Sequence, residues 1–266
     1  MDAQDLHIWL ADDASSFASL RTLHPSQILS QKEIARCAAF YHADNRQRAQ
    51  VARLMVRQLF SHYHPDISPS QWQFTVGRYG KPAIRNPLAR PLHFSLSHCK
   101  GMVALAICRE PLVGVDVENH HALADVSAVM PAALTADEQA YVSAQESQQR
   151  ARFYAIWTMK EAWLKATGDG LTQPLAALNV AVSEGGECRV TAAPGIAPAH
   201  FRPHCQQWPL ASRWTLSLAV NLPQPRIQFY HWQGDGRAHT CPAWMSEEID
   251  THVEASGAAL VDLSKG

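Results

Sequence analysis

The sequence lacks the features that would mark a secreted, membrane-spanning or nucleic-acid-binding protein. Its six cysteines are scattered, and no two of them form a C-x-x-C pair. No charged segment followed by an apolar one opens the chain, so we expect no secretory signal, no disulfide framework and a cytoplasmic location. No apolar run approaches the roughly 20 residues of a membrane span. The net charge of −1 provides no basic field for nucleic acid.

The usual sequence motifs for nucleotide binding are also absent. The chain contains neither a G-x-x-x-x-G-K-[ST] loop nor a G-x-G-x-x-G turn. A phosphate group would therefore have to be held by basic side chains scattered along the chain. The histidines and cysteines at residues 188–205 match no standard zinc spacing, so no zinc site is expected there.

The composition that remains is that of a folded globular protein. Hydrophobic residues make up 47% of the 266 residues and charged residues 18%, which is ample material for a core. Strand-like and helix-like segments succeed one another up to about residue 110, and a second series follows. We therefore predict an α+β fold of two similar halves packed side by side, residues 1–110 and 111–225. Residues 226–266 would form a C-terminal extension, irregular from Gln233 and weakly helical from Ser246.

The individual elements are predicted from their periodicity. Alternating or continuous apolar residues predict strands, and apolar stripes at helical spacing predict helices. The expected strands are 6–10, 72–76, 92–98, 102–108, 112–118, 178–182 and 214–220. The expected helices are 31–40, 46–62, one beginning after Thr135, and one within 153–171.

The segment 153–171, FYAIWTMKEAWLKATGDGL, is the one around which the chain is organised. Its apolar residues recur at helical spacing, and Gly168 follows as a helix stop. Glu161 and Lys165 are four residues apart and share one face, with Trp157 one turn earlier. Such a pair is either an ordinary exposed ion pair or part of a site, and a second acidic group upstream favours the site.

That second group is the strand-like sequence Gly-Val-Asp-Val-Glu, which contains Asp116 and Glu118. Residues two apart on a strand point to the same side, so these carboxylates lie next to one another. Two like charges in this position repel unless both are solvated or share a cation. The stretch is therefore either the polar outer face of a half-exposed strand or half of a cation site.

Basic side chains that could hold a phosphate lie upstream. The helix expected at 46–62 carries several arginines, Arg48 among them, which form a solvated face or turn inward to a phosphate. A Tyr-Gly-Lys-Pro turn places Lys81 on a proline-flanked loop, and the strand at 92–98 ends in a Ser-His pair. The phosphate candidates are Arg48, Lys81, His98 and Lys165.

The carboxylates and the lysine together point to a divalent metal. Oxygen-only ligands suit magnesium, which a few carboxylates usually hold together with phosphate oxygens and waters. Asp116, Glu118 and Glu161 could supply such ligands, and Lys165 could contact the same phosphates as a point charge. The sequence therefore predicts a magnesium site for a ligand that contains phosphate.

Four motifs in order make the chain similar to a known family. They are Y-G-K-P, F-S-L-S-H, G-V-D-V-E and W-T-M-K-E-A-W-L-K, within a likeness that runs from about residue 31 to 182. In these the chain resembles the 4′-phosphopantetheinyl transferases of the surfactin-synthetase-activating (Sfp) type. The resemblance implies a duplicated fold with pseudo-twofold symmetry. It also implies an enzyme that moves 4′-phosphopantetheine from coenzyme A to a serine of an apo carrier domain, with release of adenosine 3′,5′-bisphosphate.

The resemblance further implies roles for individual residues. Asp116, Glu118 and Glu161 would hold the Mg²⁺ ion that bridges the coenzyme A diphosphate. Lys165 would contact that diphosphate, and Glu161 is our choice of general base for the carrier serine, which makes these two residues catalytic. The cofactor-binding residues would be Arg48, Lys81, Pro82, Ser97, His98, Asp116 and Lys165, with His98 near the 3′-phosphate.

Two positions depart from the family pattern or have a second interpretation. The family carries a basic pair near Lys32 and Arg36, but Glu33 interrupts it here, which leaves open which residue meets the 3′-phosphate. Glu138 matches a family glutamate sometimes placed at the metal. Glu138 also lies three residues after Thr135, as in a helix capping box, and both interpretations stand.

The expected partners are apo acyl or peptidyl carrier domains of fatty-acid, polyketide or nonribosomal-peptide synthesis, and the enzyme is expected to be a monomer. The alternative function is a magnesium-dependent hydrolase of nucleotide diphosphates, which could use the same carboxylates without a carrier. A non-enzymatic partner of a biosynthetic complex is a third possibility, against which the intact acidic set argues. The sequence leaves open the carrier, the tolerance for acyl-coenzyme A and the role of residues 233–266.

Overall fold

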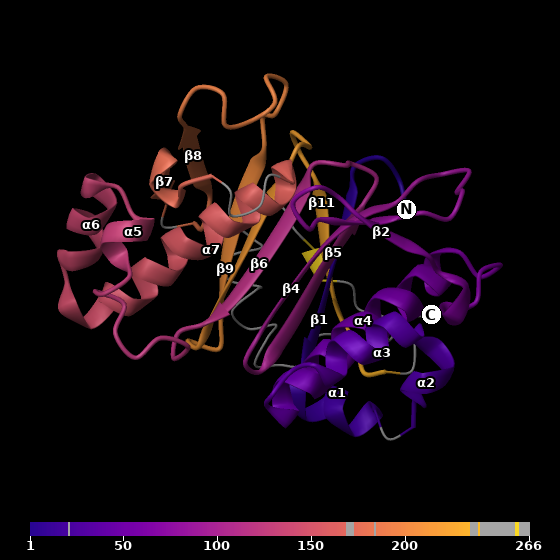
Figure 1. Ribbon diagram of the computed structural model, residues 1–266. Coiled ribbons are helices and arrows are strands. Elements are labelled where there is room, and N and C mark those ends of the chain that lie inside the picture. The colour runs from indigo at the N-terminus through magenta and orange to yellow at the C-terminus, as the bar shows by residue number, and fades with distance from the viewer. Residues whose placement is uncertain (21, 169–172, 184, 235–238, 240–258, 261–266) are drawn as a thin grey trace.

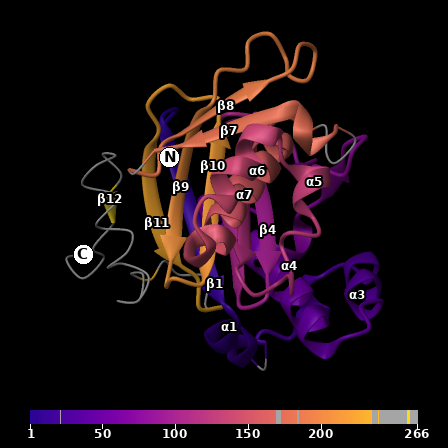
Figure 2. The ribbon, with the colours of Figure 1, turned by 90° about the vertical axis from the view of Figure 1, so that its left-hand side faces the viewer.

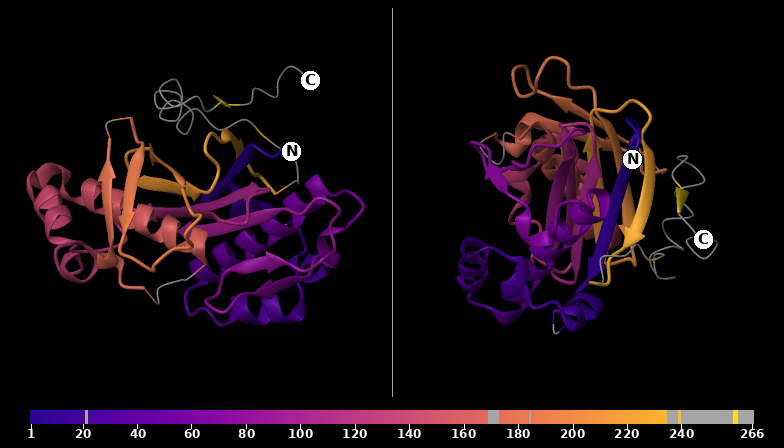
Figure 3. Two further views of the ribbon diagram at one scale, coloured as in Figure 1. Left: turned by 90° about the horizontal axis from the view of Figure 1, so that it is seen from above. Right: turned by 90° about the vertical axis from the view of Figure 1, so that its right-hand side faces the viewer.

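The computed structural model describes residues 1–20, 22–168, 173–183, 185–234, 239 and 259–260 (Figure 1). It contains two main sheets, with strand orders β12-β11-β1-β5-β4 and β6-β10-β9. Helices cover the outer faces of both. The turned views show the two groups of helices apart from each other, one coloured salmon and the other indigo to purple (Figures 2 and 3). The predicted α+β class is confirmed.

The elements have the following bounds. The first sheet contains β1 (Asp5–Asp12), β4 (His93–Cys99), β5 (Met102–Cys108), β11 (Arg226–His231) and β12 (Ala259–Leu260). The second contains β6 (Val113–Asn119), β9 (His204–Leu210) and β10 (Trp214–Val220). Two hairpins pair β2 (Phe74–Val76) with β3 (Pro82–Ile84), and β7 (Leu178–Val182) with β8 (Cys188–Ala192). The α-helices are α1 (Asp13–Ser19), α2 (Pro25–Ile28), α3 (Gln31–Ala38), α4 (Ala43–Tyr63), α5 (Met130–Ala133), α6 (Ala136–Ser143) and α7 (Gln149–Thr167). Short 3₁₀ helices lie at η1 (Pro69–Gln71), η2 (Glu146–Gln148) and η4 (Leu175–Ala177).

The two sheets pack face to face, and their inner faces form one core. Ile8 and Ala104 of the first sheet belong to the same buried cluster as Val115, Val117 and Leu216 of the second. Because side chains alternate along a strand, the valines of β6 point into this core and its acidic residues point the other way. This alternation directs Asp116 and Glu118 away from the inter-sheet core.

A long helix covers the outer face of each sheet. The apolar stripe of α4, with Leu54, Met55 and Leu59, packs against Leu105 and Ile107 of β5. On the second sheet α7 packs against β6 and β10. Each half therefore contains a sheet with a long helix on its outer face, as the expected duplication requires.

Most of the predicted elements are present, and five of the described strands were not predicted: β3, β8, β9, β11 and β12. The strands at 102–108, 178–182 and 214–220 have the bounds expected. By contrast β9 and β11 were missed because neither alternates cleanly, and β9 contains Pro209, which is tolerated at the edge of a sheet. Strand β8 does alternate, but it is only five residues long and its sequence neighbours are rich in glycine and proline. The strand expected at 72–76 begins only at Phe74, because Trp72 ends the 3₁₀ helix η1.

The C-terminal segment returns to the first half. Strand β11 pairs in parallel with β1, so residues 226–231 lie inside the N-terminal sheet rather than beyond it. The division at 110 and 225 stays a prediction. The helix expected from Ser246 falls almost wholly outside the described residues, of which Ala259–Leu260 form β12. Within the described part of the chain, no helix has the length and apolar character needed to cross a membrane.

Candidate active site

The closeness of α7 to β6 depends on Gly114, the first residue of the G-V-D-V-E motif. A Cβ atom at this position would lie 1.9 Å from the carbonyl oxygen of Ala162 and 2.4 Å from the backbone nitrogen of Ala166. Both distances are far below van der Waals contact, so only glycine permits this approach. The approach brings Asp116 and Glu118 of β6 opposite the face of α7 that carries Glu161.

We expect Gly114→Ala to lower the free energy of unfolding by about 1–3 kcal/mol, the usual cost of overpacking a tight interior. The added methyl group meets backbone atoms of α7, which cannot move aside as a side chain could. Urea unfolding followed by circular dichroism measures the change. Gly185→Ala is the matched control, because nothing lies within 4 Å of a Cβ placed there. Equal effects of the two substitutions would contradict the proposed contact.

The acidic residues of β6 and α7 line one cavity of about 390 Å³ where the two halves meet, which we call the acidic cavity. It lies where β4, the edge strand of the first sheet, runs beside β6. The lining residues are Leu96, Ser97, His98, Asp116, Glu118, Trp157, Glu161 and Lys165. The structure thus brings together six of the nine residues expected at the site, and with them all three expected metal ligands.

Asp116 and Lys165 form the polar centre of this cavity. The Nζ atom of Lys165 lies 2.5 Å from Oδ1 of Asp116 and donates to Oγ of Ser97 at 2.9 Å. Ser97 in turn donates to the same Oδ1 at 2.8 Å. The other oxygen of Asp116, Oδ2, is buried and has no hydrogen-bond partner. An unpaired buried carboxylate oxygen is costly, so this atom needs a ligand that the protein does not supply.

The electrostatics of the cavity also favour a cation. Burial, and then the nearby charge of Asp116, raises the pKa of Glu118 to about 7. The same two causes raise the pKa of Glu161, while Lys165 acts in the opposite direction on both. Carboxylates crowded in this way resist ionisation until a positive charge is shared among them.

The residues present fit a magnesium ion in chemistry, although they are not yet gathered around a single point. Among the described residues, no three His, Cys, Asp or Glu side chains are close enough together to hold an ion. The ammonium group of Lys165 already neutralises Asp116. Glu118 and Glu161 would have to turn toward the unpaired Oδ2 of Asp116 for the three carboxylates to share one ion.

A second cavity, of about 560 Å³, adjoins the first, since Leu96 and His98 line both. Its walls come from α3, α4, β4 and the β2–β3 hairpin, and they combine aromatic and basic side chains, so we call it the basic cavity. The aromatic residues are Trp72, Phe74 and Phe94, and the basic residues are Lys32, Arg36, Arg53, Arg57, Arg85 and His98. Such a cavity suits a flat ring with phosphate groups attached.

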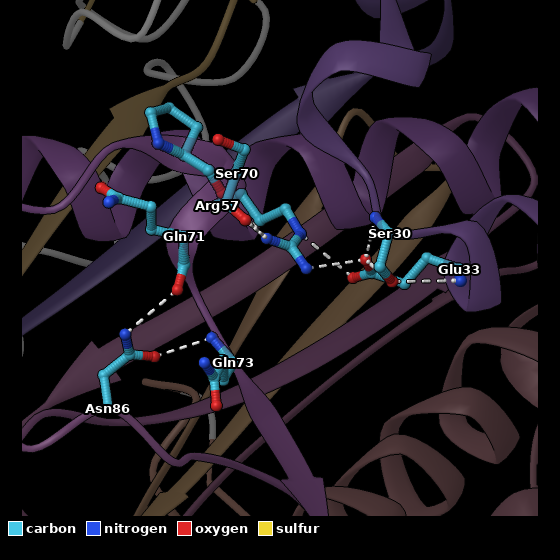
Figure 4. A network of polar contacts seen from close by, with 8 residues as sticks. Ser30, Glu33, Arg57, Ser70, Gln71, Gln73 and Asn86 are labelled. Carbon is cyan, nitrogen blue, oxygen red and sulfur yellow. Dashed lines mark hydrogen bonds and ion pairs between the residues drawn. The ribbon is translucent and has the colours of Figure 1, made fainter.

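Glu33 and Arg57 shape this second cavity rather than serve as free charges. Arg57 of α4 reaches both carboxylate oxygens of Glu33, at 2.7 and 3.2 Å, and also the carbonyl oxygens of Pro69 and Ser70 (Figure 4). Glu33 also completes a capping box with Ser30 at the start of α3. The acidic residue that interrupts the basic pair therefore fastens α3 to α4, which leaves Lys32 and Arg36 available at the cavity wall.

The structure does not bring Arg48 to either cavity. Arg48 is only 5% exposed and forms a two-pronged ion pair with Asp13, at 2.5 and 3.1 Å. Arg53, five residues later on α4, lines the basic cavity instead. Sequence reasoning included Arg53 among the arginines of this helix that could turn inward but did not single it out, because both arginines border the same apolar stripe and the distant Asp13 distinguishes them. The phosphate-binding role of Arg48 stays a prediction without geometric support.

Lys81 is likewise engaged elsewhere. Its Nζ atom donates to the carbonyl oxygens of Pro111, Val113 and Ala166, at 3.0, 3.1 and 2.9 Å. Burial lowers the pKa of Lys81 to about 8. Lys81 therefore joins the turn before β3 to β6 and α7, and its predicted phosphate contact would require it to leave three carbonyl oxygens. Pro82, next to it, does line the basic cavity.

The capping-box interpretation of Glu138 is confirmed. The side chain accepts hydrogen bonds from the backbone nitrogens of Thr135 and Val180, at 2.7 and 2.8 Å, and pairs with Lys160 at 2.5 Å. Glu138 is 3% exposed and does not line the acidic cavity. Its role is to fasten α6 and β7 to α7.

Comparison with known proteins identifies the same relationship over most of the chain. A family model described as "4′-phosphopantetheinyl transferase, N-terminal" matches residues 19–110. A second, described as "4′-phosphopantetheinyl transferase superfamily", matches residues 112–219. The two matches meet between β5 and β6, close to the predicted boundary between the halves.

Individual relatives are similar at modest identity. The 4′-phosphopantetheinyl transferase HetI of Nostoc sp. is 27% identical over 194 residues, which cover 72% of this chain and 80% of the relative. Sfp of Bacillus subtilis, also named a 4′-phosphopantetheinyl transferase, is 26% identical over 65% of this chain and 75% of its own length. A phosphopantetheinyl transferase of Thraustochytrium sp. is 25% identical over 88% of this chain and 81% of its own.

Proposed function

The chain belongs to the 4′-phosphopantetheinyl transferase superfamily, and from this premise we propose how its two cavities transfer phosphopantetheine from coenzyme A to a carrier serine. The observation that carries the proposal is the acidic cavity, in which Asp116, Glu118 and Glu161 face Lys165 beside an unpaired carboxylate oxygen. The basic cavity adjoins it, so the pair can accept one extended ligand. The products would be holo carrier domain and adenosine 3′,5′-bisphosphate.

The basic cavity would hold the nucleotide end of coenzyme A. Its aromatic walls suit the adenine ring, and Lys32, Arg36, Arg53 and Arg85 surround the space with positive charge. A guanidinium group binds a phosphate through two parallel hydrogen bonds, which makes the arginines the stronger candidates for the 3′-phosphate. His98, which lines both cavities, would lie between the nucleotide and the diphosphate.

The acidic cavity would hold the diphosphate and the metal. Asp116, Glu118 and Glu161 would bind Mg²⁺, which when bound supplies positive charge to the diphosphate as the P–O bond breaks. Lys165 would release Asp116 and place its ammonium group on the diphosphate. Ser97 already donates to Asp116, so it would keep the orientation of that carboxylate during the exchange.

Glu161 would accept the proton of the carrier serine. It lines the acidic cavity on the half-exposed face of α7, between Trp157 and Lys165, and so lies beside the proposed metal and diphosphate. The serine hydroxyl would attack the phosphorus atom of the phosphopantetheine arm as its proton passes to Glu161. The bond to the adenosine-bearing phosphate breaks in the same displacement.

Mass spectrometry of apo carrier domains tests this function directly. Each domain is incubated with the protein, coenzyme A and Mg²⁺, and a gain of one phosphopantetheine arm on its serine is the expected result. Relative rates among fatty-acid, polyketide and nonribosomal-peptide carriers identify the partner. Consumption of coenzyme A without any carrier would instead support the hydrolase, and no reaction under either condition would refute both.

We expect Mg²⁺ to stabilise the protein more at pH 8 than at pH 6. The pKa of Glu118 is raised to about 7, so at pH 6 this carboxyl is protonated in most of the molecules, and the metal must displace that proton. The stability of the metal-free protein changes with pH in the opposite direction. A raised carboxyl pKa contributes stability that is lost as pH rises through about 7. Thermal unfolding with and without Mg²⁺ at the two pH values measures this. Glu118→Gln should remove most of the difference, and an equal Mg²⁺ effect at both pH values would contradict it.

A further inference from the structure

The loop that follows β6 is fastened to the first two turns of α7. Arg150 donates three hydrogen bonds to carbonyl oxygens of this loop: Nη1 to His120 at 2.9 Å and to Leu123 at 2.6 Å, and Nη2 to Ala124 at 3.1 Å. We call residues 120–124 the latch loop. Three carbonyl oxygens on one guanidinium group leave this loop little freedom to move away from the helix.

Tyr154, one turn further along α7, adds a second set of contacts. Its hydroxyl oxygen accepts a hydrogen bond from the backbone nitrogen of Leu123 at 3.0 Å. Its ring stacks on that of His120, with centroids 5.4 Å apart and an interplanar angle of 12°. His120 is also held by Thr215 of β10, at 2.8 Å. The latch loop is therefore bound to α7 and to the second sheet together.

The residues that hold the latch loop lie on the same stripe of α7 as the residues of the acidic cavity. Arg150, Tyr154, Trp157, Glu161 and Lys165 follow one another at intervals of three or four residues, so they form a single stripe along α7. The latch lies at one end of this stripe and the acidic cavity at the other. The helix that carries the catalytic residues is thus the helix to which the loop after Glu118 is attached.

Two of the contacts between strand β6 and helix α7 lie on either side of the acidic residues. At the start of the strand, Gly114 touches Ala162 and Ala166 of the helix. Just beyond its end, the latch loop is held by Arg150 and Tyr154. Between these two contacts, α7 is also bonded to Asp116 through Lys165, and to Ser217 of β10 through Thr158 at 2.7 Å. The latch is the contact with α7 that follows Glu118 in the chain.

We propose that Arg150 is a positioning residue, which acts with Tyr154 to hold Glu118 at the correct distance from Glu161 for metal binding. The inference rests on the proposed function, because it takes both glutamates as metal ligands. Arg150 itself does not line either site cavity, so it would not touch coenzyme A or the metal. A displacement of about 1 Å between catalytic groups can lower a rate about 100-fold, so a loosened latch should be measurable.

Arg150→Gln tests this role against a merely structural one. Mn²⁺, which takes the same oxygen ligands as Mg²⁺, serves as the probe, and its binding is followed by electron paramagnetic resonance. We expect Arg150→Gln to weaken Mn²⁺ binding and to lower kcat, each by about tenfold or more, while the affinity for coenzyme A without metal changes less than about twofold. Arg150→Lys should restore much of both losses, since an ammonium group can still donate to two of the carbonyl oxygens.

Arg152→Gln is the matched control. Arg152 lies two positions after Arg150 on α7, but its hydrogen bonds go to Gln145, Gln148 and the carbonyl oxygen of Tyr141. The same substitution there should leave Mn²⁺ binding and kcat unchanged. Tyr154→Phe is the second variant in case Arg150→Gln does not fold, because it removes a single hydrogen bond and keeps the stacked ring. It should weaken Mn²⁺ binding in the same direction by a smaller factor.

The outcomes separate this inference from the proposed function. Normal Mn²⁺ affinity and normal kcat in folded Arg150→Gln or Tyr154→Phe protein would overturn the positioning role, even if the unfolding temperature fell. A wild-type protein that modifies no carrier would refute the proposed transfer. In that case the Mn²⁺ titration of the variants still decides whether the latch sets the geometry of the acidic cavity.

Discussion

Glu161→Gln should lower the rate of phosphopantetheine transfer by at least about 100-fold and leave the fold intact. The substitution keeps the size and hydrogen-bonding capacity of the side chain but removes its charge and its ability to accept a proton. Both proposed roles of Glu161, as metal ligand and as general base, depend on that charge. The side chain is only partly buried and lines an open cavity, so the protein should unfold at nearly the same temperature.

Rates measured by mass spectrometry of a carrier domain, together with thermal unfolding, provide the comparison for Glu161→Gln. Glu146→Gln, on the exposed 3₁₀ helix η2, is the matched control and should behave like the wild type. Electron paramagnetic resonance of bound Mn²⁺ separates the two roles, since loss of a ligand weakens binding whereas loss of a base alone does not. Near-normal turnover by Glu161→Gln would rule out its assignment as the base.

Glu138→Ala is expected to cost about 3–5 kcal/mol of unfolding free energy, the largest stability effect that we predict. The ammonium group of Lys160 is completely buried, and it bonds to Glu138 and to the carbonyl oxygen of Ala133. Burial lowers the pKa of Lys160, and its partner Glu138 opposes that shift. Removal of Glu138 leaves a buried positive charge without its counterion, and it also leaves the backbone nitrogens of Thr135 and Val180 without an acceptor.

Urea unfolding measures this loss, and a second substitution tests its cause. In the Glu138→Ala protein, replacement of Lys160 by methionine removes the unpaired charge and should recover part of the lost stability, because apolar residues often replace buried ion pairs without penalty. Glu146→Ala, on the surface, should change the stability by less than about 0.5 kcal/mol. A loss below about 1 kcal/mol for Glu138→Ala would show that water or another group satisfies Lys160.

Local patterns in the sequence were sufficient for the elements that carry the acidic cavity. The alternation of G-V-D-V-E put Asp116 and Glu118 on one side of a strand, and that strand is β6. Helical spacing put Glu161 and Lys165 on one face of α7, and Gly168 ends the helix in the left-handed conformation, with φ at 80°. The Thr135 capping box was likewise visible from two residues three apart. Each of these features depends on neighbours within about one helical turn or two strand residues.

The basic cavity could not be predicted in the same way. Its lining residues come from segments more than sixty positions apart in the chain, from Ser30 to His98. Arg48 and Arg53 look alike in the sequence, and their roles differ because Asp13 lies within reach of only the first. The sequence makes Lys81 a candidate for phosphate binding. In the structure its ammonium group instead donates to three carbonyl oxygens, of Pro111, Val113 and Ala166.

The sequence by itself determined the secondary structure around the motifs, the family to which the chain is similar, and the identity of the acidic residues. The tertiary structure alone decided which basic side chains face a cavity, where β11 returns to the first sheet, and how Arg150 joins the loop after Glu118 to α7. The physical reason is the range of the interactions. Periodicity and capping act between neighbours in the chain, whereas ion pairs and hydrogen bonds between distant segments depend on which surfaces the packing of two sheets brings together.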